Sequence, residues 1–231
     1  MTNGGKEWYS FLYMDRQGTL MGEYIGKLRT LPFMSVILVA VNAAVYVLCQ
    51  IPGNVLYDVG CLSAVRVLAY DEYGRIFWAM FLHADTGHLF NNMILLLFMG
   101  AMIEKEIGHL PFAGIYLVSG IGGNLLSLAG KIVGNDWAVS LGASGAIFGL
   151  NGLLLALVLV SGRKMKSVTP RRVILMICLS LYSGFTGSNV DNLAHIGGLL
   201  AGFALGMILA LYIRVSDKKE SGAGYGGQGE Y

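Results

Sequence analysis

The chain has 231 residues, of which 55% are hydrophobic and only 13% are charged, about half of the roughly 25% charge that soluble domains carry. This composition excludes an ordinary soluble globular fold, and a net charge of +2 is too small to indicate nucleic-acid binding. The three cysteines, Cys49, Cys61 and Cys178, are an odd number and imply no disulfide framework. A single Cys49–Cys61 bridge stays open as an alternative.

Residues 1–31 are predicted to form a cytoplasmic N-terminal tail. Seven charged side chains lie among residues 1–29 with no apolar core between them, so a cleavable signal peptide is not expected. The aromatic stretch at 8–13 fits either a segment at the membrane surface or an ordinary part of the tail.

Six charge-free runs of 18 or more residues follow the tail and together hold 136 of the 231 residues. A helix that crosses the hydrocarbon core needs about 20 such residues, so the runs predict six transmembrane helices within a membrane domain at 32–214. In chain order the runs are Thr30–Tyr57, Thr86–Ile103, Ile107–Gly130, Trp137–Gly162, Val173–Val190 and Asn192–Ile213.

The connection between the first two runs is long, about 30 residues after Pro52, where most loops need only a few. It is also rich in apolar side chains, so we expect it to lie partly embedded in the outer membrane interface. Its Arg75 is expected either at the lipid headgroups or inside the loop. A long, structured loop of this kind often has a function.

The distribution of Lys and Arg predicts the topology. With the N-terminus inside, 13 basic residues fall in cytoplasmic segments and 3 in outer ones, as the positive-inside rule requires. Both termini are therefore predicted to be cytoplasmic, and residues 215–231, which are rich in glycine, are predicted to form a C-terminal tail. The second, fourth and sixth helices then run inward from the outer face.

Strongly polar side chains inside predicted spans are costly in lipid and therefore indicate a function. They are His88, Asn91 and Asn92 in the second run, Ser144 in the fourth and His195 in the sixth. At a rise of about 1.5 Å per residue, each lies within roughly a dozen ångströms of the outer end of its helix. The shared depth predicts one site below the outer surface.

These residue types fit nucleophilic catalysis. A serine hydroxyl is a weak nucleophile until a neighbouring base takes its proton, and histidine is the usual base near neutral pH. No Asp or Glu is expected at that depth, so the minimal set is a dyad of Ser144 and His195. The backbone N–H of Ser144 at a helix start, with His88 and Asn92 facing it, would stabilise an oxyanion.

Plainer interpretations stay open at this point. Gly145 and Gly149 form a Gly-xxx-Gly pair, so the nearby serine fits helix packing, and His195 precedes glycines at helical spacing, where an inter-helix hydrogen bond is the default. A metal site would use His83, His88 and His195, but five residues separate the first two, whereas one helix face needs three or four. No metal is expected.

Together these motifs resemble the rhomboid family of intramembrane serine proteases over roughly residues 32–214. The Gly-Ala-Ser-Gly segment at 142–145 matches the family's Gly-x-Ser-Gly, which implies Ser144 as the nucleophile. The Ala-His-Ile-Gly-Gly segment at 194–198 resembles the last-helix motif, which implies His195 as the general base. His88 and Asn92, four residues apart, match the family's oxyanion-stabilising pair.

The resemblance also implies structural roles for further residues. His83 matches a structural histidine five residues before His88, and Arg75 stands where the first-loop Trp-Arg motif has its arginine, although Gly74 replaces the Trp. Phe148 stands where many members carry a tyrosine that stacks on the catalytic histidine. The full set of supporting residues is His83, Arg75, Glu104, Phe148, Gly142, Gly198 and Gly202.

The resemblance implies an all-α membrane protein, a six-helix rhomboid-like bundle with a long, partly embedded loop between its first two helices. It implies an endopeptidase without a cofactor that cleaves transmembrane segments of other membrane proteins near the outer face, with the fifth span as a mobile gate. The cell membrane is the expected location, and no oligomeric state is predicted. A catalytically inactive relative that binds membrane helices is the alternative, followed by a small transporter.

Overall fold

The computed structural model describes residues 32–160, the single positions 171, 175, 178, 179 and 182, and residues 190–223, with side chains as far as 215. Every regular element within this part of the chain is a helix, apart from one isolated antiparallel bridge between Leu62 and Ser140. The predicted gate in the fifth span lies almost wholly outside the described residues, as does the predicted N-terminal tail. Of the predicted C-terminal tail, residues 215–223 are described and continue the last helix, and the rest lies outside the described residues.

Five helices coincide with five of the predicted spans. Three are long and apolar enough to cross a membrane: α7 (Thr86–Ile107), α8 (His109–Gly134) and the Asn192–Val215 part of α11 (Asn192–Ala223). The other two, α3 (Phe33–Cys49) and α9 (Ser144–Val160), are apolar helices of 17 residues. The chain is therefore an all-helical membrane bundle, as the composition predicts.

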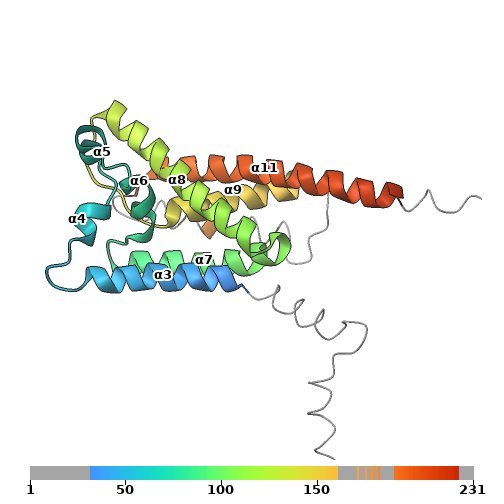
Figure 1. The fold of residues 1–231 in the computed structure, drawn as a ribbon, viewed down its shortest axis with the longest axis horizontal. Helices are drawn as coiled ribbons and strands as arrows, with labels where there is room; N and C mark the ends of the chain where they lie inside the picture. Colours follow the sequence, from blue (N-terminus) through green and yellow to red (C-terminus); the bar gives the residue numbers. More distant parts are fainter. Residues whose placement is uncertain are drawn as a thin grey trace, which may run out of the picture.

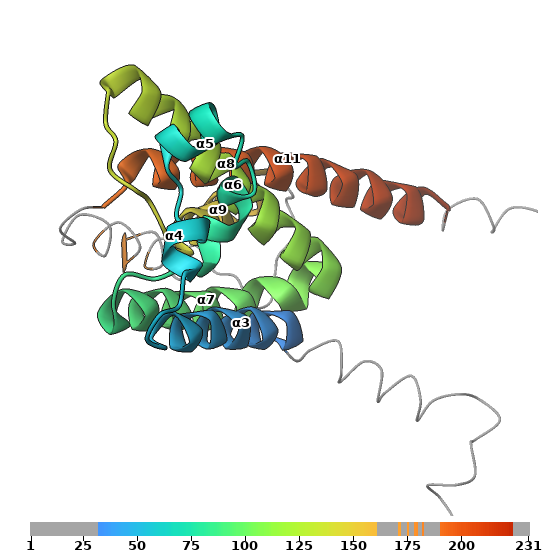
Figure 2. The same cartoon turned by 60° about the vertical axis from the view of Figure 1, so that its left-hand side comes forward.

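The five helices form two close pairs and a crossing helix. Figures 1 and 2 show α3 and α7 side by side, α9 against α11, and α8 running obliquely across the bundle. The start of α3 and the far end of α11 lie toward the same end of the molecule (Figure 1). The main core is made of Met80, Leu96, Met99, Phe112, Tyr116, Ile147, Leu150, Leu153 and their neighbours.

The pair α9–α11 is held in backbone contact by glycines. A Cβ atom at Gly198 would lie 1.9 Å from the carbonyl oxygen of Gly145, and one at Gly202 would lie 1.9 Å from that of Gly149. Both distances are far inside van der Waals contact, so only glycine permits this approach.

The long connection between α3 and α7 is structured. It contains the short helices α4 (Leu56–Gly60), α5 (Ala64–Tyr70) and α6 (Arg75–Trp78) and the 3-10 turn η1 (Ala79–Phe81). Some apolar side chains of the loop are buried, namely Val67, Met80, Phe81 and Leu82, and others are exposed, namely Val65, Leu68 and Trp78. The exposed set fits a loop that lies in the membrane interface.

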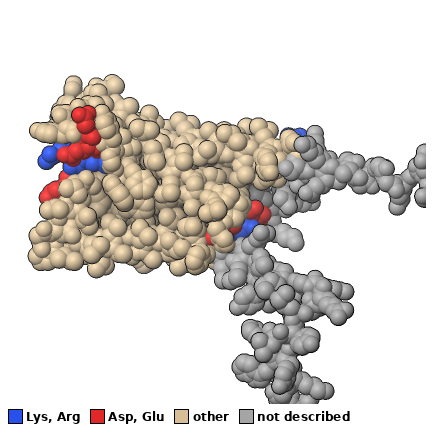
Figure 3. All heavy atoms as spheres, in the orientation of Figure 1, with Lys and Arg blue, Asp and Glu red and all other residues tan. Residues whose placement is uncertain are grey.

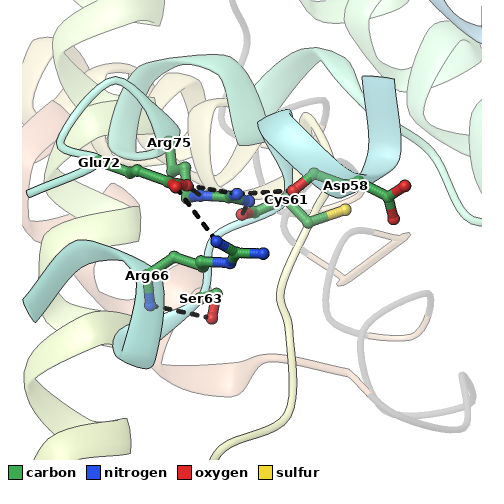
Figure 4. Close-up of polar contacts among 6 residues, drawn as sticks. All are labelled: Asp58, Cys61, Ser63, Arg66, Glu72 and Arg75. Atoms are coloured by element: carbon green, nitrogen blue, oxygen red, sulfur yellow. Dashed lines mark hydrogen bonds and ion pairs between the residues drawn. The ribbon is translucent and has the colours of Figure 1, made fainter. Parts of the chain in front are cut away.

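Arg75 lies inside this loop, which settles the choice between loop and headgroups. The residue is only 4% exposed and donates hydrogen bonds to the backbone oxygens of Cys61 at 2.9 Å and Asp58 at 2.6 Å and to the carboxylate of Glu72 (Figure 4). One guanidinium thus joins α4, α6 and the turn between α5 and α6. Burial raises the pKa of the neighbouring Cys61 thiol to about 11, and all three cysteines are free.

The loop is also hydrogen-bonded to α8 and to the segment that precedes α9. The Leu62 and Ser140 backbones exchange two hydrogen bonds of 2.9 Å, and the Gly142 N–H donates to Ala79 at 2.9 Å. The side chain of Asn124 on α8 donates to the Ile76 carbonyl at 2.8 Å. The loop therefore fixes the segment that leads into α9.

Charged side chains avoid the middle of the molecule. On the face in Figure 3 they gather at the end formed by the loop helices and, at the other end, near the turn between α7 and α8, with an uncharged band between them. This is the pattern of a protein whose middle lies in hydrocarbon.

Candidate active site

Ser144 is the first residue of α9. Gly142 precedes it with a φ of +130°, a conformation that residues with a Cβ rarely adopt, and its N–H is held by the Ala79 carbonyl. This bend turns the incoming segment into the helix, so the half-buried Ser144 lies where backbone N–H groups have no partner within the helix.

His195 lies in the first turns of α11, only 8% exposed, with its Nε2 2.9 Å from the Oγ of Ser144. This is a hydrogen-bond distance across 51 residues of sequence. The imidazole is stacked on the ring of Phe148, with ring centroids 4.2 Å apart and planes 8° from parallel. Phe148 lies one turn after Ser144 on α9, so a single helix carries the hydroxyl and the surface that orients the imidazole.

His88 and Asn92 are on α7, one turn apart. Asp85 caps this helix by accepting a 2.8 Å hydrogen bond from the His88 N–H. The His88 ring lies against Gly142, where a Cβ atom would approach its Cε1 to 2.7 Å and Ser144 Oγ to 3.8 Å. His88 is therefore close to the serine, and glycine at 142 is required both by its φ angle and by this contact.

Asn92 is buried, and its Nδ2 has no hydrogen-bond partner among the described residues. A buried amide donor without a partner is costly. Such donors are often found where a ligand or reacting group supplies the missing acceptor. Asn91, the neighbouring asparagine, is exposed.

His83 lies just before α7 and is fully buried, with its ring 5.1 Å from that of His88 in an edge-on arrangement. Its carbonyl accepts a 2.5 Å hydrogen bond from the Tyr57 hydroxyl. Burial, with a smaller contribution from His88, lowers the pKa of His83 to about 3. The ring is thus neutral, which suits a packing role beside the site.

Glu104 lies near the other end of α7, away from this cluster. Its carboxylate accepts hydrogen bonds from the N–H of Met34 at 2.6 Å, from the N–H of Ser35 at 3.0 Å and from the Ser35 hydroxyl at 2.6 Å. His109 also contacts it. These contacts tie α7 to the beginning of α3, so Glu104, like Arg75, acts on the fold and not on the reacting atoms.

Sequence reasoning missed Asp191. In the sequence Asp191 separates the last two charge-free runs, and the depth argument predicts no carboxylate at the site. In the structure Asp191 comes one turn before His195, and its carboxylate accepts hydrogen bonds from Ser127, Ser140 and the N–H of Ala194. An Asp four residues before a functional histidine at a helix start was the signal available.

The arrangement can support acyl transfer. A hydroxyl lies against an imidazole, the imidazole is stacked and buried, and the His88 ring of α7 and the backbone N–H groups at the start of α9 are near the hydroxyl. These are the three parts that serine hydrolysis needs: nucleophile, base and oxyanion stabilisation. Within the described residues no group of three His, Cys, Asp or Glu side chains could hold a metal ion.

Comparisons with known proteins point the same way. A family model described as a rhomboid domain matches residues 70–212. RHOMBOID-like protein 4 of Arabidopsis thaliana is 38% identical over 158 residues, which cover 68% of this chain and 39% of that protein. Rhomboid-like protease 1 of Toxoplasma gondii is 34% identical over 160 residues, which cover 68% of this chain and 53% of that protein.

Rhomboid protease GluP of Bacillus subtilis (strain 168) is 36% identical over 145 residues, which cover 63% of this chain and 28% of that protein. The matched part of the chain thus spans between 28% and 53% of the length of these three relatives.

Proposed function

The chain belongs to the rhomboid family of intramembrane serine proteases, and we propose that it is an active endopeptidase with Ser144 as nucleophile and His195 as general base. The observation that carries the proposal is the 2.9 Å distance between Ser144 Oγ and His195 Nε2. Two residues 51 positions apart meet on two helices in backbone contact. Packing alone does not require a hydroxyl and an imidazole at that point.

In the first step the Ser144 hydroxyl gives its proton to His195 Nε2 while Oγ bonds to the carbonyl carbon of the scissile peptide. The carbonyl oxygen becomes an oxyanion. We assign its stabilisation to the His88 side chain, the Nδ2 of Asn92 and the N–H of Ser144. The support for Asn92 is its buried, unpaired Nδ2.

The tetrahedral intermediate then collapses. The C–N bond breaks, His195 gives its proton to the leaving amine, and an acyl ester remains on Ser144. Water, deprotonated by His195, attacks the ester, and the acid product leaves as Ser144 regains its proton. Phe148 would hold the imidazole in one plane through both steps, because the stack leaves the ring little freedom to rotate.

The substrates proposed are transmembrane segments of other membrane proteins, cleaved near the outer face after lateral entry from the lipid bilayer. The depth of Ser144, at the start of a membrane helix and below the structured loop, supports access of water from that side. We further propose cytoplasmic termini, a cell-membrane location and a membrane domain at 32–214 between two tails, which the positive-inside count supports.

The test uses a fluorophosphonate probe, which phosphorylates activated serines, on the purified full chain in detergent. Wild-type protein is expected to be labelled and to cleave a model transmembrane substrate, whereas Ser144→Ala and His195→Ala abolish both. Ser119→Ala is the matched control, because this buried serine on α8 has no hydrogen-bond partner among the described residues. Absence of labelling in folded wild-type protein would instead support the inactive, helix-binding relative.

A further inference from the structure

Asp191 joins three elements beside the proposed site. One carboxylate oxygen accepts a 3.0 Å hydrogen bond from the N–H of Ala194, three residues on, which caps the start of α11. The other oxygen accepts hydrogen bonds from the hydroxyls of Ser127 on α8 and Ser140 in the segment before α9. Both serines are buried.

These contacts bear on both members of the dyad. Ser140 is four residues before Ser144 and is itself bonded to the loop through Leu62, while Ala194 is the residue before His195. The Asp191 carboxylate thus sets where the nucleophile's segment lies relative to the helix that carries the base.

Asp191 also brings a negative charge. Burial alone would raise the pKa of its carboxyl, but hydrogen bonds from Ser127, Ser140 and Ala194, together with nearby Lys131, hold that pKa below its usual value. The group is therefore ionised at neutral pH.

The charges that face Asp191 and His195 come from several elements. Lys131 on α8 is buried and lies 3.4 Å from Asp136, which partly neutralises it. His88 on α7 lies next to Gly142. Among the described residues Asp191 is the nearest anion to His195 along α11, one helical turn before it.

We propose that Asp191 is a positioning residue of the protease: it fixes the segment of Ser144 against α11 and its negative charge stabilises the imidazolium of His195 that forms when Ser144 loses its proton. This inference rests on the proposed function. Asp191 differs from the carboxylate of a catalytic triad, because it accepts its hydrogen bonds from two hydroxyls and a backbone N–H and the imidazole is oriented by Phe148.

The experiment measures the rate of fluorophosphonate labelling against pH for purified full-length protein, across the range in which histidine titrates. Asp191→Asn removes the charge but keeps an oxygen that can cap α11, since Asn and Asp are equally good caps. Asp191→Glu keeps the charge. Asp71→Asn is the matched control: Asp71 is an exposed loop acid with a φ of 56°, which Asn also tolerates.

In the profile of labelling rate against pH, we expect the plateau of Asp191→Asn to be roughly tenfold lower than that of wild type. We expect its acidic limb, the part where the rate falls as His195 becomes protonated, to be displaced to lower pH by about half a unit to one unit. The sign follows from the charge: without the carboxylate the protonated imidazole is less stable, so it loses its proton at lower pH and is a weaker base. Asp191→Glu is expected to return the limb toward that of wild type, and Asp71→Asn is expected to match wild type.

Two outcomes overturn the inference alone: Asp191→Asn superimposes on Asp71→Asn, or its plateau falls while the limb stays in place, which would mean a purely structural cap.

If Asp191→Asn does not fold, Ser140→Ala serves instead, because it keeps the charge and releases only the segment before α9. For Ser140→Ala, a plateau severalfold lower than that of wild type with the limb at the same pH supports the inference. An unchanged plateau in Ser140→Ala refutes it. Wild-type protein that is never labelled refutes the proposed function first.

Discussion

The two helix pairs of the bundle are joined in different ways. At the α9–α11 pair, the atoms that a Cβ on Gly198 or Gly202 would meet belong to the opposite backbone. At the α3–α7 pair, a Cβ on Gly100 would meet the side chain of Ser35, and the main tie is the buried Glu104 carboxylate. A backbone carbonyl cannot move aside, whereas the Oγ of Ser35 can rotate away, although its Cβ, 2.6 Å from the Cβ position at Gly100, cannot. We therefore call α9–α11 the rigid pair.

The difference corresponds to what each pair carries. The rigid pair holds Ser144 and His195, whose oxygen and nitrogen must stay at hydrogen-bond distance for the proposed mechanism. The pair joined through side chains anchors α7, which brings His88 close to Ser144 from outside the rigid pair and carries the buried Asn92 one turn further on. A displacement of about 1 Å can cost roughly 10² in rate, so the contacts that hold the dyad have the least tolerance for change.

The largest effect is expected from the double variant Gly198→Ala, Gly202→Ala. Two methyl groups would be forced against carbonyl oxygens at 1.9 Å, so α9 and α11 must separate and the dyad must open. We expect probe labelling to fall by at least roughly 10³-fold, with a lower melting temperature. Both are measured on protein in detergent.

The control for this variant is Gly114→Ala on α8. A Cβ atom there would meet nothing within 4 Å, so this helix should accept alanine without loss of activity. If the double variant retained wild-type labelling, backbone contact would not be what holds the dyad, and the contrast between the two pairs would disappear.

A second prediction concerns the donors that α7 brings. Asn92→Ala removes the buried Nδ2 and is expected to lower kcat by roughly 10²–10³-fold with little change in KM, as for one lost oxyanion donor. The matched control is Asn91→Ala, because Asn91 is exposed. Equal losses in the two variants would remove Asn92 from the oxyanion site.

Phe148 gives a third, smaller effect within the rigid pair. Phe148→Leu removes the flat surface on which the imidazole lies at 4.2 Å, so the ring gains freedom and the cleavage rate should fall roughly tenfold. Phe148→Tyr keeps the stack and should retain most of the activity. A tyrosine variant as impaired as the leucine variant would show that ring volume, and not stacking, matters at this position.

These contrasts show what the sequence could and could not predict. Hydropathy was enough to predict the five described membrane helices, and depth grouped Ser144, His195 and His88, which lie together in the structure, because lipid makes each polar residue conspicuous. The place of Asn92 in that group stays a prediction. Helix ends were harder to predict, since a charge-free run does not show where a helix is capped. The run Thr30–Tyr57 contains α3, which already ends at Cys49, and the first two residues of α4.

Contacts over long sequence distances were out of reach. The hydrogen bonds between Leu62 and Ser140 follow no local periodicity. Asp191 was missed because a charged residue was treated only as the end of a span, although its carboxylate is satisfied by Ser127, Ser140 and Ala194. Tertiary hydrogen bonds decide such positions, and a pattern read along one segment does not contain them.

The smallest effect on activity is expected at the α3–α7 tie. Glu104→Gln replaces one carboxylate oxygen, which accepts hydrogen bonds, by an amide nitrogen, which cannot. The donors left facing that nitrogen are either the Met34 N–H and His109, or the N–H and hydroxyl of Ser35. Each buried donor left unsatisfied costs about 1–3 kcal/mol, so the melting temperature should fall by several degrees.

Labelling of the folded fraction of Glu104→Gln should nevertheless stay within about threefold of wild type, because the dyad belongs to the other pair and backbone contact there is unchanged. Glu106→Gln, two residues on along the same helix, carries the same change of charge and should lower the melting temperature less. If Glu104→Gln reduced labelling as much as Asn92→Ala does, α7 would transmit movement from its anchor on α3 to its donors. A change at the α3–α7 pair would then alter the site that the α9–α11 pair carries.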